Sequence, residues 1–182
     1  IAGTTGKQTG ALPAYRSGGQ ASLLTLVQGI TADGSRNRLS PQLSFYSGRF
    51  GLMAEYAWSE SWVKKASTGT RARFSGEAWQ ATATFTLTGE KASFSGVRPS
   101  ETFEPGQGKW GALELAGRVN GIEIGTEAFE EGVLDPTKSV RKAFAWAVGL
   151  NWTLSRNIKQ VVNLERTTFT GGAQGGVSRP AE

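Results

Sequence analysis

The chain has 182 residues, enough for one domain, with 20 basic and 15 acidic side chains and a net charge of +5. It contains neither cysteine nor histidine, which excludes disulfides, Cys/His metal sites and every catalytic arrangement that uses histidine as the base. The 25 glycines and the 10% of aromatic residues favour a β-protein with many turns.

The N-terminal quarter predicts loops and two short strands. Residues 1–19 are rich in glycine, threonine and serine and predict a loop. The apolar run 21–27 predicts a short strand, and the polar stretch 31–38 predicts a connection. A second strand is expected over 39–47, weakened at its start because Pro41 has no N–H to donate.

Strict alternation begins after the very short turn at Gly48-Arg49. Residues 50–59 and 78–88 both place large apolar side chains in one phase and small or polar ones in the other. A period of two assigns the two sets to opposite faces of a strand. Between these strands, residues 60–73 predict a polar, basic loop. In 78–88 the polar phase is formed by Gln80 and four threonines, which form one fully polar face.

Two long irregular segments flank the next strand. Residues 89–109 contain two prolines and predict an irregular connection. Residues 110–119 resume the alternation, and 125–138 predict an acidic loop. The Gly-rich residues 170–182 predict a loop after the last strand.

The clearest element is a hairpin over residues 144–169. Large apolar side chains occupy every even position from Phe144 to Leu154, and residues 155–157 form a tight connection to a second arm. Ten steps of a strand span roughly 33 Å, or about 25 Å vertically when tilted, which is the height of the apolar band of an outer-membrane barrel. Trp146 and Trp152 suit the edges of such a band. The hairpin therefore favours a barrel over a soluble sandwich.

The predicted connections alternate in length along most of the chain. They are short at 48–49 and 155–157, and longer at 31–38, 60–73, 125–138 and 170–182. Barrels with short periplasmic turns and long outer loops show this alternation. The long segment 89–109 falls on the short-turn side and does not fit. Counting gives about seven strands.

Several ordered stretches resemble the phosphate-selective porin O and P family. They are RLSPQ (38–42), GRFGLMAEY (48–56), residues 79–118 and AWAVGLNWTLSRNIKQVVNLERTTF (145–169). The resemblance implies an all-β, antiparallel transmembrane β-barrel of 16 strands, usually trimeric, that conducts anions.

The resemblance extends over roughly residues 10 to 182 and matches the C-terminal half of that barrel. It implies that an N-terminal half and one final strand after Glu182 are missing from this sequence. An open seven-stranded sheet would leave two unpaired edges, for which lipid offers no hydrogen-bond partners. Part of the family's anion-binding residues lies in the missing half, so none is transferred to this chain.

Basic side chains are the candidates for anion binding or pore lining. Lys64, Lys65, Arg71 and Arg73 crowd one predicted loop, where they would draw anions toward a pore or simply be solvated. Arg118 and Arg141 fall in the inward phase, where guanidinium can hold phosphate. For Arg118, a neutralising partner is expected four residues earlier in the same strand, at Glu114.

Three carboxylates, Glu55, Glu114 and Glu165, also fall in the inward phase. Paired carboxylates can perform acid–base catalysis, but polar neighbours favour a solvated channel wall. We therefore expect no enzyme, no metal and no cofactor.

The sequence predicts a channel in the bacterial outer membrane for passive diffusion of small anions such as phosphate. Expected partners are outer-membrane lipid, lipopolysaccharide and two further copies in a homotrimer, and no nucleic acid. One alternative is a soluble β-sandwich that binds glycans through exposed Trp58, Trp62 and Trp110. Another is an adhesin or structural barrel with a closed lumen.

Overall fold

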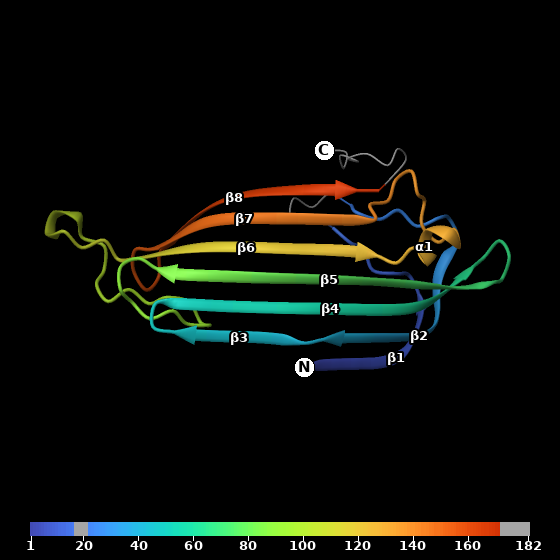
Figure 1. Cartoon of the computed structure of the whole chain (residues 1–182), viewed down its shortest axis with the longest axis horizontal. Coiled ribbons are helices and arrows are strands. Elements are labelled where there is room, and N and C mark those ends of the chain that lie inside the picture. Colours follow the sequence, from blue (N-terminus) through green and yellow to red (C-terminus); the bar gives the residue numbers. More distant parts are fainter. Residues whose placement is uncertain (17–21, 172–182) are drawn as a thin grey trace.

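The computed structural model describes residues 1–16 and 22–171. They form one antiparallel sheet in the order β1-β2-β4-β5-β6-β7-β8, with β3 also paired to β4 (Figure 1). The prediction of an all-β antiparallel fold is confirmed. The strands are β1 (Ala2–Gly10), β2 (Ile30–Ser40), β3 (Gln42–Ser47), β4 (Phe50–Lys65), β5 (Arg71–Thr86), β6 (Ala112–Ile124), β7 (Lys142–Thr153) and β8 (Lys159–Thr170).

Strands β2 and β3 lie in line and share one neighbour. Both pair with β4, and Pro41 alone separates them. The Pro41 carbonyl still accepts a hydrogen bond from the Tyr56 N–H at 3.1 Å, but proline has no N–H to return. The proline therefore divides one long strand, so the eight strands fill seven positions across the sheet.

The sheet is open in this structure. Every neighbouring pair from β4 to β8 is a continuous antiparallel ladder, and β4 with β5 runs unbroken from Phe50↔Phe85 to Lys64↔Arg71. Within residues 1–16 and 22–171, β1 and β8 each have a partner on one side only.

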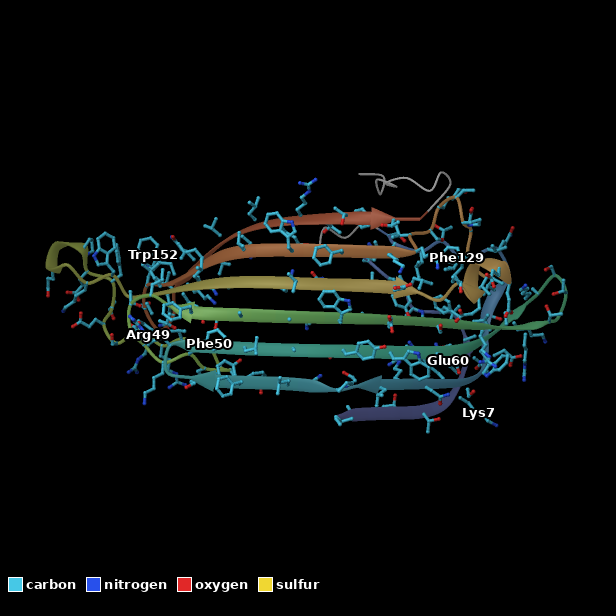
Figure 2. The ribbon with its side chains drawn as sticks, viewed as in Figure 1. Lys7, Arg49, Phe50, Glu60, Phe129 and Trp152 are labelled. Atoms are coloured by element: carbon cyan, nitrogen blue, oxygen red, sulfur yellow. The ribbon has the colours of Figure 1, made fainter. Side chains whose placement is uncertain are left out.

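Connections gather at the two ends of the strands. The end that carries 48–49, 87–111 and 154–158 is called the Gly48 end, and the opposite end, with 11–29, 66–70 and 125–141, is called the α1 end. Figure 2 shows Trp152 and Phe50 at the first end and Phe129 and Glu60 at the second. Because 66–70 is a five-residue turn and 87–111 is long, neither end has uniformly short turns. The predicted alternation of connection lengths is therefore wrong.

The two faces of the sheet differ in chemistry. The register aligns the even-numbered residues of β7 with alternate residues of each neighbouring strand. The side of the sheet to which these residues point is called the apolar face. Its large side chains are exposed: Phe85, Leu115 and Val148 keep 43%, 50% and 47% of their surface. The opposite side is called the polar face. This distribution is the reverse of a soluble sandwich, whose apolar faces are buried against each other.

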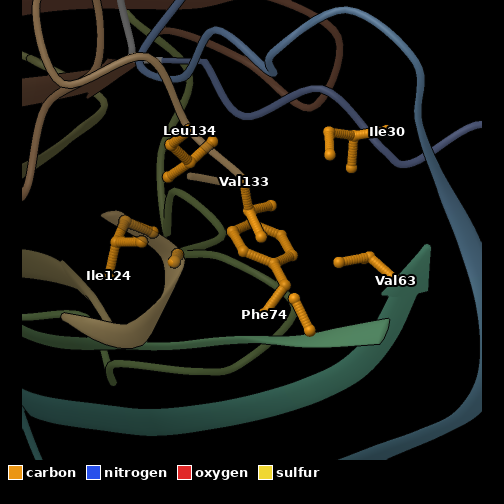
Figure 3. Close-up of a cluster of buried hydrophobic side chains, with 8 residues drawn as sticks. Ile30, Val63, Phe74, Ile124, Val133 and Leu134 are labelled. Atoms are coloured by element: carbon orange, nitrogen blue, oxygen red, sulfur yellow. The ribbon is translucent and has the colours of Figure 1, made fainter. Parts of the chain in front are cut away.

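The buried core lies on the polar face, at the α1 end. Val63 from β4 and Phe74 from β5 point toward Val133 and Leu134 of the 125–141 connection (Figure 3). This connection includes the short helix α1 (Glu127–Glu130). Residues from 12–15 and 24–26 pack against the same cluster. The two connections thus fold over one end of the polar face.

Three predictions for the N-terminal region are wrong. Residues 2–10 form β1 instead of a loop, and 31–38 lie in β2 instead of forming a connection. The side chains of these segments are small or polar and do not alternate with large apolar ones, so the sequence shows no strand pattern there. The two strands are held in the sheet by the backbone hydrogen bonds between them. The apolar residues 22–27 are not a sheet strand, because Leu23 and its neighbours pack at the α1 end; residue 21 lies outside the described ones.

Other predictions hold, with shifted boundaries. The hairpin of β7 and β8 is confirmed, and the long segment 87–111 is irregular apart from the 3₁₀ turn η1 (Pro105–Gln107).

The predicted loop 60–73 is wrong, because β4 continues to Lys65 and β5 starts at Arg71. The predicted loop 170–182 lies almost wholly outside the described residues. In the part of the chain that the structure describes, no helix is long and apolar enough to cross a membrane.

Candidate functional site

The polar face gathers hydrogen-bonding side chains from five neighbouring strands, β4 to β8. On β5, Gln80, Thr82 and Thr84 all point to this side because every second residue of a strand shares a face. Hydroxyls, amides and charges at this density suit contact with water and dissolved solutes. The same face also carries Glu55, Glu114, Arg118, Asn120, Asn151, Asn163, Glu165 and Thr167.

The three carboxylates share this face, as the alternation predicts, but they differ in their partners. Glu55 accepts hydrogen bonds from Ser40, Gln42 and Gln80 at 3.0, 2.9 and 3.1 Å. Glu114 accepts one from Asn151 at 2.8 Å. Only neutral donors therefore hold these two carboxylates in the interactions of the described residues.

Arg118 lies on the polar face, but the prediction that Glu114 is its partner is wrong. Its Nη2 donates to Glu165 Oε2 at 2.9 Å, across β7, while Glu114 is bonded to Asn151. The strand register brings Arg118 and Glu165 into one row through Ala147. A partner two strands away is invisible in the sequence, because the register that aligns it comes from the whole sheet.

The connections at the α1 end restrict access to the polar face. Segment 22–27 is hydrogen-bonded to 133–140 through Val27 N–H to Val133 O at 3.0 Å and Val140 N–H to Leu23 O at 2.8 Å. Beneath them lies a cavity of about 330 Å³, and Arg16 lines it together with Glu55 and Glu165. A solute on this face therefore meets both basic and acidic groups in a confined space.

The four basic residues of the predicted loop do not form one cluster. Strand alternation sends Lys64, Arg71 and Arg73 to the apolar side, beyond its aromatic residues, while Lys65 turns to the polar side and donates to the Glu131 carbonyl. Arg71 pairs with Asp33 at 3.2 Å. Arg73 lies 3.9 Å from a Glu60 oxygen, with its guanidinium 5.4 Å from the Trp62 ring centre.

Arg141 lies just outside β7 and away from Arg118. It lines a hollow together with Glu77 and Glu123 at the α1 end. Those two carboxylates are aligned in register with each other and with Lys142, on the apolar side of the sheet. The structure does not bring Arg141 and Arg118 together.

Sequence reasoning missed two basic residues of the polar face, Arg36 and Arg38. They stand opposite Ser61 and Ser59 of β4, and Arg36 also donates to Gln8 of β1 at 2.9 Å. The prediction of a connection over 31–38 assigns neither arginine to a face of the sheet. Their spacing of two in SRNRLS was the signal that would have placed both on one face.

Comparison with known families gives one match. A sequence model of the family described as phosphate-selective porin O and P matches residues 18–168. No curated protein matches the chain.

Proposed function

Because this chain belongs to the phosphate-selective porin O and P family, we propose that it forms part of the wall of a channel in the bacterial outer membrane. Small anions, with phosphate among them, diffuse passively along its polar face. The observation that carries the proposal is the two-faced sheet, with large apolar side chains exposed on one side and charged and amide groups on the other.

The apolar face supports contact with lipid. A soluble protein rarely leaves so large an apolar surface uncovered. Aromatic side chains also flank this surface: Trp110 and Trp152 at the Gly48 end, Tyr56 and Trp79 toward the α1 end. Aromatic girdles at both interfaces are typical of outer-membrane barrels. The uncovered face argues against the soluble glycan-binding sandwich.

The two unpaired edges support a larger barrel. Backbone groups facing lipid must be hydrogen-bonded within the protein, so β1 and β8 need further strands on their outer sides. We infer that this sheet is the C-terminal half of the 16-stranded barrel that the family resemblance implies, with the N-terminal half and one last strand supplied from outside these residues. Trimer formation and contacts with lipid and lipopolysaccharide belong to the same proposal.

Arg36 and Arg38 are the proposed anion contacts of this half, with Arg118 largely neutralised by Glu165. Guanidinium groups on the channel side attract anions and donate to phosphate oxygens. Lys64, Lys65, Arg71, Arg73 and Arg141 remain proposed as contributors to the charge around the mouth.

Conductance of the purified channel in planar bilayers tests the proposal. We expect Arg38→Gln to shift the reversal potential in a salt gradient toward lower anion preference, and Arg38→Lys to keep the parent value. Lys7→Gln is the matched control, because Lys7 lies on the neighbouring strand in the opposite phase. A channel that conducts nothing would favour the adhesin or structural barrel. A channel that prefers cations would contradict the anion function.

A further inference from the structure

Glu55 occupies a position built by four strands. It projects from β4, and its carboxylate accepts hydrogen bonds from Ser40 at the end of β2, Gln42 at the start of β3 and Gln80 on β5. The first two donors share one oxygen of the carboxylate and Gln80 binds the other. Both oxygens are therefore fixed in place.

This carboxylate differs from Glu165 in its charge balance. Glu165 forms an ion pair with Arg118 at 2.9 Å, so the two charges largely cancel. Glu55 takes part in none of the ion pairs of the described residues, and its three donors are neutral. Hydroxyl and amide donors orient a carboxylate without neutralising it. The full negative charge therefore stays on the polar face.

Glu55 lies where two cavities of the polar face adjoin. Two cavities lie along the polar face, one of about 330 Å³ under the α1-end connections and one of about 460 Å³ toward the Gly48 end. Glu55 and Gln80 line both cavities. A solute that moves along the polar face from one cavity to the other therefore passes this pair.

We propose that Glu55 sets the anion selectivity of the channel as a fixed negative charge that weakens anion binding between the two cavities. This inference rests on the proposed function. Arg36 and Arg38 on β2 attract the anion, and Glu55 on the same face lowers its affinity so that it leaves again. Conduction requires binding that is favourable enough for entry yet weak enough for exit. Without Glu55, the basic groups would hold the anion longer.

Glu55→Gln tests the inference in single-channel recordings of the purified channel. We expect a higher anion-to-cation permeability ratio, a lower half-saturating concentration for inorganic phosphate, and a lower saturating phosphate conductance. Glu55→Asp keeps the charge and is expected to keep the parent selectivity. A permeability ratio and phosphate saturation equal to those of the parent in Glu55→Gln would overturn the inference.

Glu114→Gln is the matched control for a change of one charge on the polar face. Glu114 is also held by a neutral amide, but it lines neither cavity and lies six residues, roughly 20 Å, along β6 from the row of Glu55. That separation exceeds the screening length of about 10 Å at 0.1 M salt. Equal effects of Glu114→Gln and Glu55→Gln would show that only total charge matters, which contradicts a specific role for Glu55.

Thr82→Glu keeps the inference testable if Glu55→Gln does not fold. Thr82 lines the cavity of about 460 Å³ and makes none of the three hydrogen bonds to Glu55, so its substitution leaves them in place. A second carboxylate there should lower the anion-to-cation ratio below the parent value, and an unchanged ratio would contradict the inference. If the parent channel conducts no anions, the proposed function fails instead, which separates the two failures.

Discussion

Ala147 and Val148 are neighbours on β7 that face opposite sides of the sheet. Val148 stands in register with Leu164 on the apolar face and keeps 47% of its surface exposed. Ala147 stands between Arg118 and Glu165 on the polar face. A single step along the strand therefore moves a side chain from the proposed lipid side to the proposed water side.

This contrast predicts different costs for the same substitution. Val148→Arg should lower the free energy of unfolding in lipid vesicles by about 2–4 kcal/mol, because a charge near the membrane midplane is poorly solvated. Ala147→Arg should cost less, because water and Glu165 are available to its guanidinium. Urea titrations of both variants in the same vesicles measure the difference. Equal costs would contradict the assignment of the faces.

At the scale of elements, the β4–β5 hairpin extends past the apolar band. Beyond Trp58 most of its positions on the apolar side are charged, with Lys64 opposite Arg71 at the tip. Of the four basic residues of this hairpin, only Lys65 turns to the polar side. Any influence of the other three on a passing anion must therefore act over distance rather than by contact.

Changing Lys64, Lys65, Arg71 and Arg73 to Gln together tests this long-range influence. Phosphate conductance should fall in dilute electrolyte and converge on the parent value near ~1 M salt, where the screening length is about 3 Å. Single-channel recordings across a series of salt concentrations measure it. A loss that persists at high salt would mean that these residues hold the anion directly.

The 125–141 connection offers a pH-dependent test outside the strands. The hydroxyl of Thr137 donates to Asp135 at 2.7 Å and its N–H at 2.8 Å, and both hold the pKa of Asp135 below its ordinary 3.8. Since the folded pKa is depressed, the turn is stabilised above pH 3.8, and this stabilisation is lost as the pH falls through the lowered value.

Thr137→Val removes the hydroxyl donor and should raise the pKa of Asp135 toward its ordinary value. The turn would then loosen at a higher pH than in the parent. Carboxyl titration by NMR of the folded protein measures the shift, with Thr68→Val in the 66–70 turn as the control. A titration of Asp135 that Thr137→Val leaves unchanged would contradict the role of this hydroxyl.

At the scale of the molecule, the open sheet predicts that β1 and β8 do not meet in the functional channel. The chain lacks cysteine, so pairs can be introduced without background. Val148→Cys with Leu164→Cys, which lie opposite each other on β7 and β8, should crosslink readily. Thr5→Cys on β1, which lies on the same side of the sheet as Leu164, should not crosslink with Leu164→Cys, because further strands lie between β1 and β8. Efficient crosslinking of the second pair within one chain would show a barrel closed by these strands alone.

Strands with strict alternation were predictable from the sequence alone. The even apolar positions of 144–154 fixed both the strand and its two faces, and the same holds for the cores of β4, β5 and β6. Each of these patterns is local, because a period of two needs no information from other strands. The inward phase of Glu55, Glu114 and Arg118 followed from the same alternation, whereas the family resemblance rested on ordered stretches of sequence.

The pairing of strands, and the folding of the α1-end connections over the polar face, were decided only by the tertiary structure. Strand β1 has small side chains and is held by a backbone ladder to β2, which also turns Arg36 and Arg38 toward the polar face. The pairing of Arg118 with Glu165, and the packing of 22–27 against 133–140, join residues that are far apart in the chain. Backbone hydrogen bonds carry no side-chain signature, and register is a property of the whole sheet. For these reasons the polar-face residues of the alternating strands could be predicted, but Arg36 and Arg38, the hydrogen-bond partners on this face and the segments that cover it could not.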